Sequence, residues 1–346
     1  MAAPKTALDE LSAGAFVRSP SSFLGRLGSP AFPAEPGRYT LYVSLACPWA
    51  CRVLAALALK GLEAAFTIVH VCPTWAPTAP GLDEHRGWVF RSLAAAGSAD
   101  AALHEVPLVD PLFGAPTLRA VYEACALPEG AARPSKFTVP LLIDARTRAV
   151  VCNESSLLLR DIGGPAFNAH ARFPGVDLCP AGLRGEIEAV SEGMYEAVNN
   201  GVYKCGFAAS QAAYDAAAGA LAAALDGLAA RLSAPGCGGY LCGGVLTEAD
   251  VRLFVTLVRF DPVYVAHFKT CFRSVRAEPA LLAFLRRVHA AVGGAGGCSV
   301  GAASVRLDHI KQHYFGSHPK LNPHGIVPMA HKDEGVELLL HPGAPP

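Results

Sequence analysis

The chain has 346 residues, of which 52% are hydrophobic and 17% are charged, a composition typical of a folded globular protein and unlike that of a disordered one. Its 29 Lys and Arg residues balance its 29 Asp and Glu residues. The sequence has no run of Lys and Arg of the kind that contacts a phosphate backbone, so nucleic acid is not an expected partner. The longest uncharged stretch, 64–82, contains three prolines, and the N-terminus resembles neither a signal nor a transit peptide, so we expect a cytoplasmic protein with no membrane partner.

Residues 1–37 are rich in Ser, Pro, Gly and Ala and predict an irregular N-terminal extension. A thioredoxin-like domain is expected over 38–170. It opens with a strand over 39–45, a helix over 48–60 that begins with Pro and ends at a Gly, and a strand over 65–71. After an insertion over 73–112, we expect a helix over 118–126, a hairpin of strands over 139–144 and 149–152, and a helix over 154–161. This order, β-α-β-α-β-β-α, is thioredoxin-like.

The sequence of the second half predicts an all-helical domain over 180–330, followed by a tail over 331–346. Helical periodicity without a convincing strand covers 183–198, 208–232, 249–260, 280–292 and 303–314. Thr247 and Asp250 predict a capping box at the start of one helix, and the glycine-rich run 290–305 predicts a surface loop. The fold class is therefore α/β followed by all-α.

Cys47 is the strongest candidate for chemistry because it precedes Pro48 at a strand-to-helix junction. A sulfur at a helix N-terminus faces unpaired N–H groups and the positive end of the helix dipole, which predicts a pKa below that of an ordinary thiol. Cys51 follows at a spacing of four residues, which suits a disulfide poorly, so monothiol chemistry with an external thiol is favoured over a resolving role for Cys51.

Two further features fit a peptide-binding site. Val139-Pro140 is a candidate cis-proline, at which the backbone of Val139 could pair with an extended peptide such as glutathione. Glu154 and Ser155 begin the next helix, where N–H groups and a hydroxyl suit a carboxylate and Glu154 suits an ammonium group. Each feature alone has an ordinary structural explanation; together they resemble the glutathione site of the glutathione transferases.

The resemblance extends to one class, the glutathionyl-hydroquinone reductases or xi class, and covers the chain from about Tyr39 to Pro328. It depends on long motifs in order: Leu45 to Ala50, Lys60 to Glu63, Gly87-Trp88 with Phe90, Asn199 to Lys204, Gly206 to Ala208, Leu246 to Phe254, Arg259 to Tyr264, His267 to Lys269, and Ile310 to Pro328.

The resemblance implies a glutathione transferase fold, usually as a homodimer, and a reduction of glutathionyl-hydroquinones with glutathione as co-substrate. It implies Cys47 as nucleophile, Tyr203 as proton donor and acceptor, and Tyr264 and Tyr314 as stabilisers of the thiolate. The glutathione-binding residues that it implies are Trp88, Lys136, Phe137, Thr138, Val139, Glu154 and Ser155. Three positions depart from the family pattern: Cys51 replaces His, Lys136 replaces Arg, and Phe315 replaces a second Tyr.

Other functions stay open at this point. A general glutathione thiol transferase or dehydroascorbate reductase would use the same cysteine, and a glutathione or aromatic-ligand carrier would not react at all. His309 and His313 have the spacing of helical metal ligands and His318 follows, but no Glu accompanies them, so we expect no metal; His324 and His331 are expected to be solvated.

Overall fold

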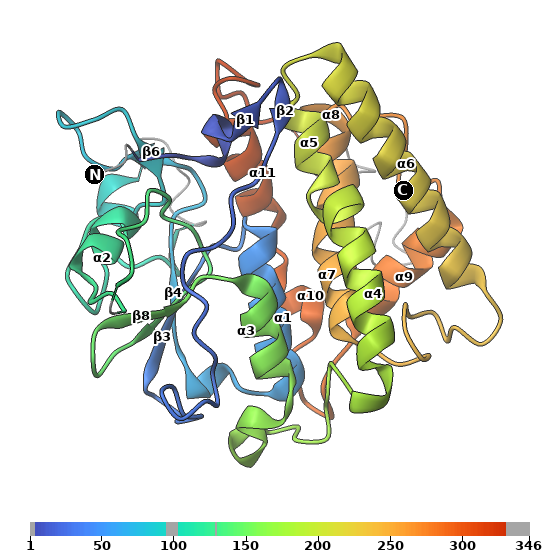
Figure 1. Cartoon of the computed structure of the whole chain (residues 1–346), viewed down its shortest axis with the longest axis horizontal. Helices are drawn as coiled ribbons and strands as arrows, with labels where there is room; N and C mark the ends of the chain where they lie inside the picture. The colour runs from blue at the N-terminus through green and yellow to red at the C-terminus, as the bar shows by residue number, and fades with distance from the viewer. Residues whose placement is uncertain (1–3, 95–102, 129, 330–346) are drawn as a thin grey trace.

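The computed structural model describes residues 4–94, 103–128 and 130–329. A four-stranded sheet occupies one side of the molecule and a group of helices the other, with α1 and α3 between them (Figure 1). The strands are β1 Leu11–Ser12, β2 Ala15–Phe16, β3 Tyr39–Val43, β4 Thr67–His70, β5 Ala76–Pro77, β6 Arg86–Gly87, β7 Leu141–Asp144 and β8 Ala149–Cys152. The α-helices are α1 Pro48–Lys60, α2 Leu118–Ala124, α3 Ser155–Gly163, α4 Arg184–Met194, α5 Gly201–Phe207, α6 Gln211–Ser233, α7 Glu248–Arg259, α8 Val265–His267, α9 Pro279–Ala290, α10 Val300–Ser304 and α11 Leu307–Ser317.

The sheet has the order β4-β3-β7-β8, in which β3 runs parallel to β4 and antiparallel to β7. All five residues of β3 are buried, as expected for a central strand rich in aromatic and β-branched residues. α1 follows with Pro48 at its first position and ends at Gly61, which adopts the left-handed conformation that glycine favours. The thioredoxin-like order and the bounds predicted for this helix are confirmed.

The second half is helical, as predicted, and its capping box at Thr247 is formed. The helix expected over 303–314 is wrong in one respect, because the backbone is extended at Val305 and Arg306 and separates α10 from α11. α10 packs against α1, whereas α11 carries residues of the cleft described below. The break lets the two segments meet different partners.

Short π-helical turns follow α4 and α7, over Tyr195–Asn199 and Phe260–Tyr264. Each turn inserts an extra residue into the helical repeat, which rotates the following residues relative to the preceding helix. The 3.6-residue period did not predict these turns. Tyr195 and Tyr264 both lie within them.

The predicted glycine-rich surface loop is only partly exposed. Gly293 lies so close to α1 that a Cβ atom built on it would be 1.8 Å from the carbonyl oxygen of Leu59. Any side chain at this position would force the loop away from α1.

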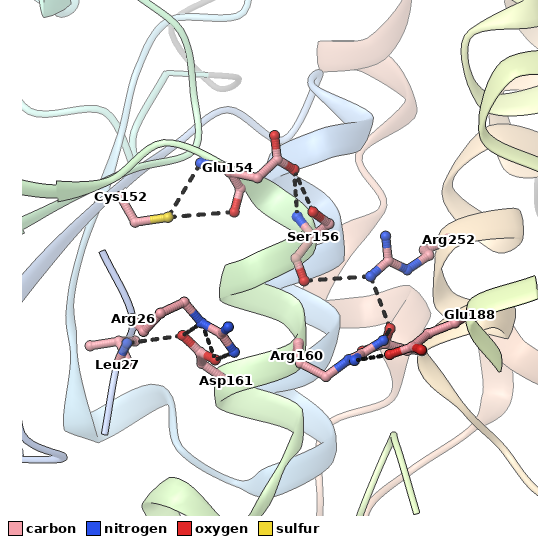
Figure 2. A network of polar contacts seen from close by, with 10 residues as sticks. Arg26, Leu27, Cys152, Glu154, Ser156, Arg160, Asp161, Glu188 and Arg252 are labelled. Atoms are coloured by element: carbon pink, nitrogen blue, oxygen red, sulfur yellow. Dashed lines mark hydrogen bonds and ion pairs between the residues drawn. The ribbon is translucent and has the colours of Figure 1, made fainter. Parts of the chain in front are cut away.

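The N-terminal extension that the sequence predicts to be irregular contains short structured elements from residue 7 onward and packs against the rest of the chain. β1 and β2 form a hairpin, and the chain then runs down beside α3 on the side of the sheet (Figure 1), where Leu24 forms a β-bridge with Cys152 of β8. Asp161 of α3 binds Arg26 in an ion pair and accepts a hydrogen bond from the backbone of Leu27 at 2.9 Å (Figure 2). This part of the chain is therefore fixed to the thioredoxin-like half.

α6 is long and apolar enough to cross a membrane by length and composition alone. In the structure it packs against α5 and α9 through a row of buried leucines, at positions 221, 225, 228 and 232. Such a row is what a helix of a bundle requires. The expected tail over 331–346 lies outside the described residues.

Candidate active site

A cleft lies between the two halves of the chain. Its empty volume, which includes space open to the solvent, is about 1230 Å³. Every site residue that the sequence predicted lines this cleft except Tyr264. The structure thus brings together residues that lie between positions 47 and 314 of the chain.

Cys47 is the N-cap of α1 and its side chain is 7% exposed. The thiol donates a hydrogen bond to the carbonyl oxygen of Val139 at a sulfur–oxygen distance of 3.5 Å. Burial raises the pKa of Cys47 to about 11, although the backbone N–H groups of Ala50 and Trp49 act in the opposite direction. The low pKa expected from the helix N-terminus is therefore wrong, because the loss of water around the sulfur outweighs the helix.

Three tyrosine hydroxyls form a chain beside Cys47. The hydroxyl of Tyr314 is 2.6 Å from that of Tyr203 and 3.0 Å from that of Tyr264. Burial raises the pKa of all three phenols, so they stay protonated and can act as hydrogen-bond donors. Within the described residues none of the three hydroxyls bonds to Cys47. Tyr203 and Tyr314 line the cleft, whereas Tyr264 does not and contacts Tyr314 through the hydrogen bond between their hydroxyls.

The predicted glutathione residues lie on the thioredoxin-like side of the cleft. The Val139-Pro140 bond is cis, as predicted. The carbonyl of Thr138 accepts a hydrogen bond from Tyr122 at 2.9 Å, and the ring of Phe137 lies against that of Tyr122. Trp88 stacks on His313, with 4.7 Å between the ring centres. These contacts fix the edge at which a peptide would bind.

Glu154 is the N-cap of α3. One of its carboxylate oxygens accepts hydrogen bonds from the backbone and hydroxyl of Ser156, each at 2.8 Å (Figure 2), and the other accepts one from Ser21. Burial raises the pKa of Glu154, but the hydrogen bonds from Ser156 and Ser21 outweigh burial and hold the pKa below its ordinary value. The carboxylate is therefore charged, as recognition of an ammonium group requires. The hydroxyl of its neighbour Ser155 lies 3.5 Å from the guanidinium of Arg52.

α3 is also tied to the helical half. The guanidinium of Arg160 binds Glu248 of α7 and Glu188 of α4, and Arg252 of α7 donates to both Glu248 and the carbonyl of Ser156 (Figure 2). Glu248 is fully buried, so its two guanidinium partners compensate its charge. This network fixes the start of α3 relative to the bundle.

Lys136 is already paired. Its ammonium group lies 2.7 Å from a carboxylate oxygen of Glu10 and 3.1 Å from the carbonyl oxygen of Ser19. A ligand carboxylate at this point would have to share Lys136 with Glu10. Both partners, Glu10 and Ser19, belong to the segment before β3, which the sequence did not connect with the site.

Cys51 and Arg259 meet beneath the loop that carries Cys47. Arg259 is fully buried, and its guanidinium donates to the carbonyls of Leu45, Ala46 and Val255 and to the sulfur of Cys51 at 3.2 Å. The Cys51 thiol has the carbonyl of Leu45 as its acceptor, at 3.4 Å. The thiols of Cys47 and Cys51 therefore donate to different carbonyl oxygens, those of Val139 and Leu45.

Two of the histidines considered as metal ligands, His313 and His318, form a buried group with His267. Nδ1 of His313 lies 2.9 Å from the carbonyl of Pro73, and Nδ1 of His318 lies 3.0 Å from Nε2 of His267. Burial lowers the pKa of His267 to about 4 and that of His313 to about 3. No group of three metal-ligating side chains occurs in the part of the chain that the structure describes. His324 is exposed; His331 lies outside that part.

Phe315, where the family commonly has a second Tyr, does not line the cleft. Its ring packs against His267, with 4.8 Å between the ring centres. This departure therefore leaves the cleft unchanged.

Sequence reasoning assigned no role in the cleft to several residues that line it. Tyr195 and Phe207 come from the helical half, and Arg18 and Ser21 come from the segment before β3. An Arg within a Ser- and Pro-rich stretch carries no signal of its own, because its contacts depend on residues far along the chain.

A thioredoxin-like sheet followed by a helical bundle, with a cleft between them and a cysteine at the start of the first helix, is the architecture of the glutathione transferases. Residues 211–289 match the family described as "Glutathione S-transferase, C-terminal domain".

The chain is 39% identical to the glutathionyl-hydroquinone reductase PcpF of Sphingobium chlorophenolicum, over 92% of this chain and 90% of that protein. Its structure is similar to that of glutathione transferase Xi 1 from Trametes versicolor, with a TM-score of 0.77, 42% identity, and coverage of 91% of this chain and 99% of that one. It is also similar to the glutathione-bound structure of YqjG from Escherichia coli K-12, with a TM-score of 0.75, 36% identity, and coverage of 89% and 92%. The chain belongs to the glutathionyl-hydroquinone reductases, the xi class of glutathione transferases.

Proposed function

We propose that this protein reduces glutathionyl-hydroquinones to hydroquinones with glutathione as co-substrate, and that Cys47 is the nucleophile. One observation carries the assignment of the nucleophile: of the eleven cysteines, all within the described residues, Cys47 alone lines the cleft. The relatives named for this activity and the glutathione-bound relative support the choice of substrate.

In the first step, the Cys47 sulfur attacks the glutathione sulfur of the conjugate. The bond between that sulfur and the ring carbon breaks, its electron pair stays with the ring, and the ring takes a proton in place of the sulfur. Tyr203, which lines the cleft and is linked to Tyr314, supplies this proton. The products are the hydroquinone and a mixed disulfide between Cys47 and glutathione.

In the second step, a glutathione thiolate attacks the mixed disulfide, which yields glutathione disulfide and the free Cys47 thiolate. Burial raises the pKa of Cys47 to about 11, so the thiolate that attacks is a minor form of this sulfur at neutral pH. The N–H groups of Trp49 and Ala50 at the start of α1 stabilise that charge.

Glutathione and the quinol ring bind on opposite sides of the cleft. The backbone of Val139 pairs with the glutathione backbone, Glu154 takes its ammonium group, and the N–H groups and hydroxyl at Ser155 take the neighbouring carboxylate. The quinol ring lies on the opposite side, against the aromatic residues of the helical half.

The test is glutathione-dependent release of a hydroquinone from its conjugate, measured for the wild type, Cys47→Ser and the control Cys271→Ser, whose cysteine is exposed. Cys47→Ser should lose the activity and retain glutathione affinity within about tenfold, because Val139, Glu154 and Ser155 bind the peptide independently of the sulfur. The control should match the wild type. Hydroquinone release by Cys47→Ser contradicts the mechanism, and faster turnover of a small glutathione mixed disulfide than of any conjugate favours a general thiol transferase.

We also propose a cytoplasmic homodimer that binds neither nucleic acid nor membranes. The balanced charge of the chain supports the absence of a nucleic-acid partner, and the dimer follows from the family. Light scattering coupled to size-exclusion chromatography tests the dimer, which a single species of 36.0 kDa would exclude.

A further inference from the structure

Arg18 places its guanidinium over aromatic rings that come from both halves of the chain and from β2. The guanidinium carbon lies 4.9 Å from the ring centres of both Tyr203 and Trp49, and 5.1 Å from that of Phe16. Its Nε donates a hydrogen bond to the side-chain oxygen of Asn200 at 2.8 Å. Three rings and one amide therefore determine where this cation lies.

Part of this cation has no hydrogen-bond acceptor. Nη2 of Arg18 is buried and has no hydrogen-bond partner among the described residues, and none of the ion pairs among those residues includes Arg18. The two carboxylates that line or border the same cleft are engaged elsewhere, Glu10 with Lys136 and Glu154 with Ser156 and Ser21. A buried, unpaired N–H of a charged group is destabilising, so an acceptor that reaches this point gains a strong hydrogen bond.

The position of Arg18 selects the acceptor. Tyr203 and Asn200 belong to the helical half, in α5 and at its N-cap, and Trp49 lies at the start of α1 two residues after Cys47, so Arg18 lies where the two halves meet, next to the proposed nucleophile and the proposed proton donor. Flat aromatic surfaces next to a cation suit an aromatic ring that carries an oxygen. The quinol part of the substrate has both an aromatic ring and ring oxygens.

We propose that Arg18 binds a ring oxygen of the quinol and stabilises the negative charge that this oxygen gains as the glutathione sulfur leaves. This inference rests on the proposed function. The conjugate reacts as its keto tautomer, in which the ring carbon that carries glutathione has taken the proton from Tyr203 and the neighbouring hydroxyl has lost its proton and become a ring carbonyl. When the Cys47 thiolate takes the glutathione sulfur, the electron pair of the broken carbon–sulfur bond moves into that carbonyl, and the oxyanion then takes a proton to give the hydroquinone.

The experiment compares two kinds of substrate in Arg18→Gln, Arg18→Lys and the control Lys320→Gln. Lys320 is an exposed residue that contacts the same N-terminal segment, at Leu8 and Asp9, outside the cleft. The first kind is a series of glutathionyl-hydroquinones whose rings carry increasing numbers of chlorine atoms. The second is the mixed disulfide of glutathione and 2-mercaptoethanol, which has no ring oxygen.

For the conjugates, kcat of Arg18→Gln should fall about 100-fold, the loss expected for one oxyanion donor, whereas turnover of the mixed disulfide should stay within about threefold. The loss should be greatest for the unchlorinated ring, because its oxyanion is the most basic. Arg18→Lys should recover part of the rate, and the control should match the wild type. Turnover of the mixed disulfide also shows that each variant is folded; if Arg18→Gln does not fold, Arg18→Lys carries the comparison, with an expected loss of about tenfold for the conjugates alone.

Three results overturn this proposal and leave the proposed function intact. Equal losses for both kinds of substrate mean that Arg18 has a structural role. A raised KM for glutathione with both substrates means that Arg18 binds a glutathione carboxylate. Unchanged conjugate turnover means that it binds nothing. If the wild type itself does not release hydroquinone from any conjugate, the proposed function fails and this inference fails with it.

Discussion

Substitution of Cys51 tests whether this thiol belongs to the structure or to the reaction. Its sulfur is fully buried and accepts a hydrogen bond from Arg259 at 3.2 Å. Cys51→Ala leaves one donor of a buried guanidinium without an acceptor, which lowers the free energy of unfolding by about 2 kcal/mol. Cys51→Ser keeps an acceptor at the same point, so its loss should be about 1 kcal/mol or less.

Activity should respond differently from stability. Cys51→Ser should keep turnover within about threefold of the wild type, because external glutathione resolves the mixed disulfide on Cys47. Urea unfolding measures the first effect, and hydroquinone release measures the second. Mass spectrometry of protein treated with glutathione disulfide should find a glutathione adduct on Cys47 in both the wild type and the variant, because exchange with that disulfide leaves one glutathione on Cys47 and releases the other.

The opposite pattern refutes this reasoning. In that case the wild type would release glutathione and gain a bond between Cys47 and Cys51, while Cys51→Ser would accumulate the adduct and slow severely. Cys51 would then be a resolving cysteine, although the two sulfurs bond to different carbonyls, those of Val139 and Leu45.

Four other outcomes can be measured. Alkylation of Cys47 in the ligand-free protein should accelerate with pH toward a midpoint of about 11; a midpoint below that of a free thiol, about 8.5, contradicts the dominance of burial. Tyr203→Phe should lower kcat about 100-fold and leave glutathione affinity within about threefold, since a proton donor acts in the transition state; equal losses would mean that it positions the substrate. Glu10→Gln should lower the KM for glutathione because Lys136 no longer shares its charge; an unchanged KM means that Lys136 does not reach the ligand. The pKa of His267 in the folded protein, about 4, is below that of an imidazole in the unfolded chain, so the unfolded chain takes up a proton first as the pH falls. Acidification from pH 7 to 5 should therefore lower the free energy of unfolding by about 2 kcal/mol on account of His267. His267→Phe should lack that part of the pH dependence.

The local elements of the fold were predictable because each has a local cause. Pro48 and Gly61 mark the ends of α1, and the alternation of turn residues and apolar runs marks the hairpin of β7 and β8. The site residues were predictable mainly from the family motifs, since a single Tyr such as Tyr203 has no feature that separates it from a core residue.

The remaining features depend on contacts between distant parts of the chain. Arg18 bonds to Asn200, 182 positions away, so no window of sequence contains both partners. The pKa of Cys47 failed as a prediction for the same reason: the helix N-terminus is visible in the sequence, but the side chains that remove water from the sulfur are not. Lys136 was predicted at the site, and its partner Glu10 was not.

The three tryptophans of the chain, Trp49, Trp75 and Trp88, all line the cleft. Their indole emission therefore comes entirely from the proposed site and contains no contribution from elsewhere in the protein. A quinol or quinone that enters the cleft should quench this fluorescence, and glutathione alone should change chiefly the part that comes from Trp88. Ligand binding can thus be followed in the unlabelled protein, before any bond is broken, and separated from the rate of the chemical step.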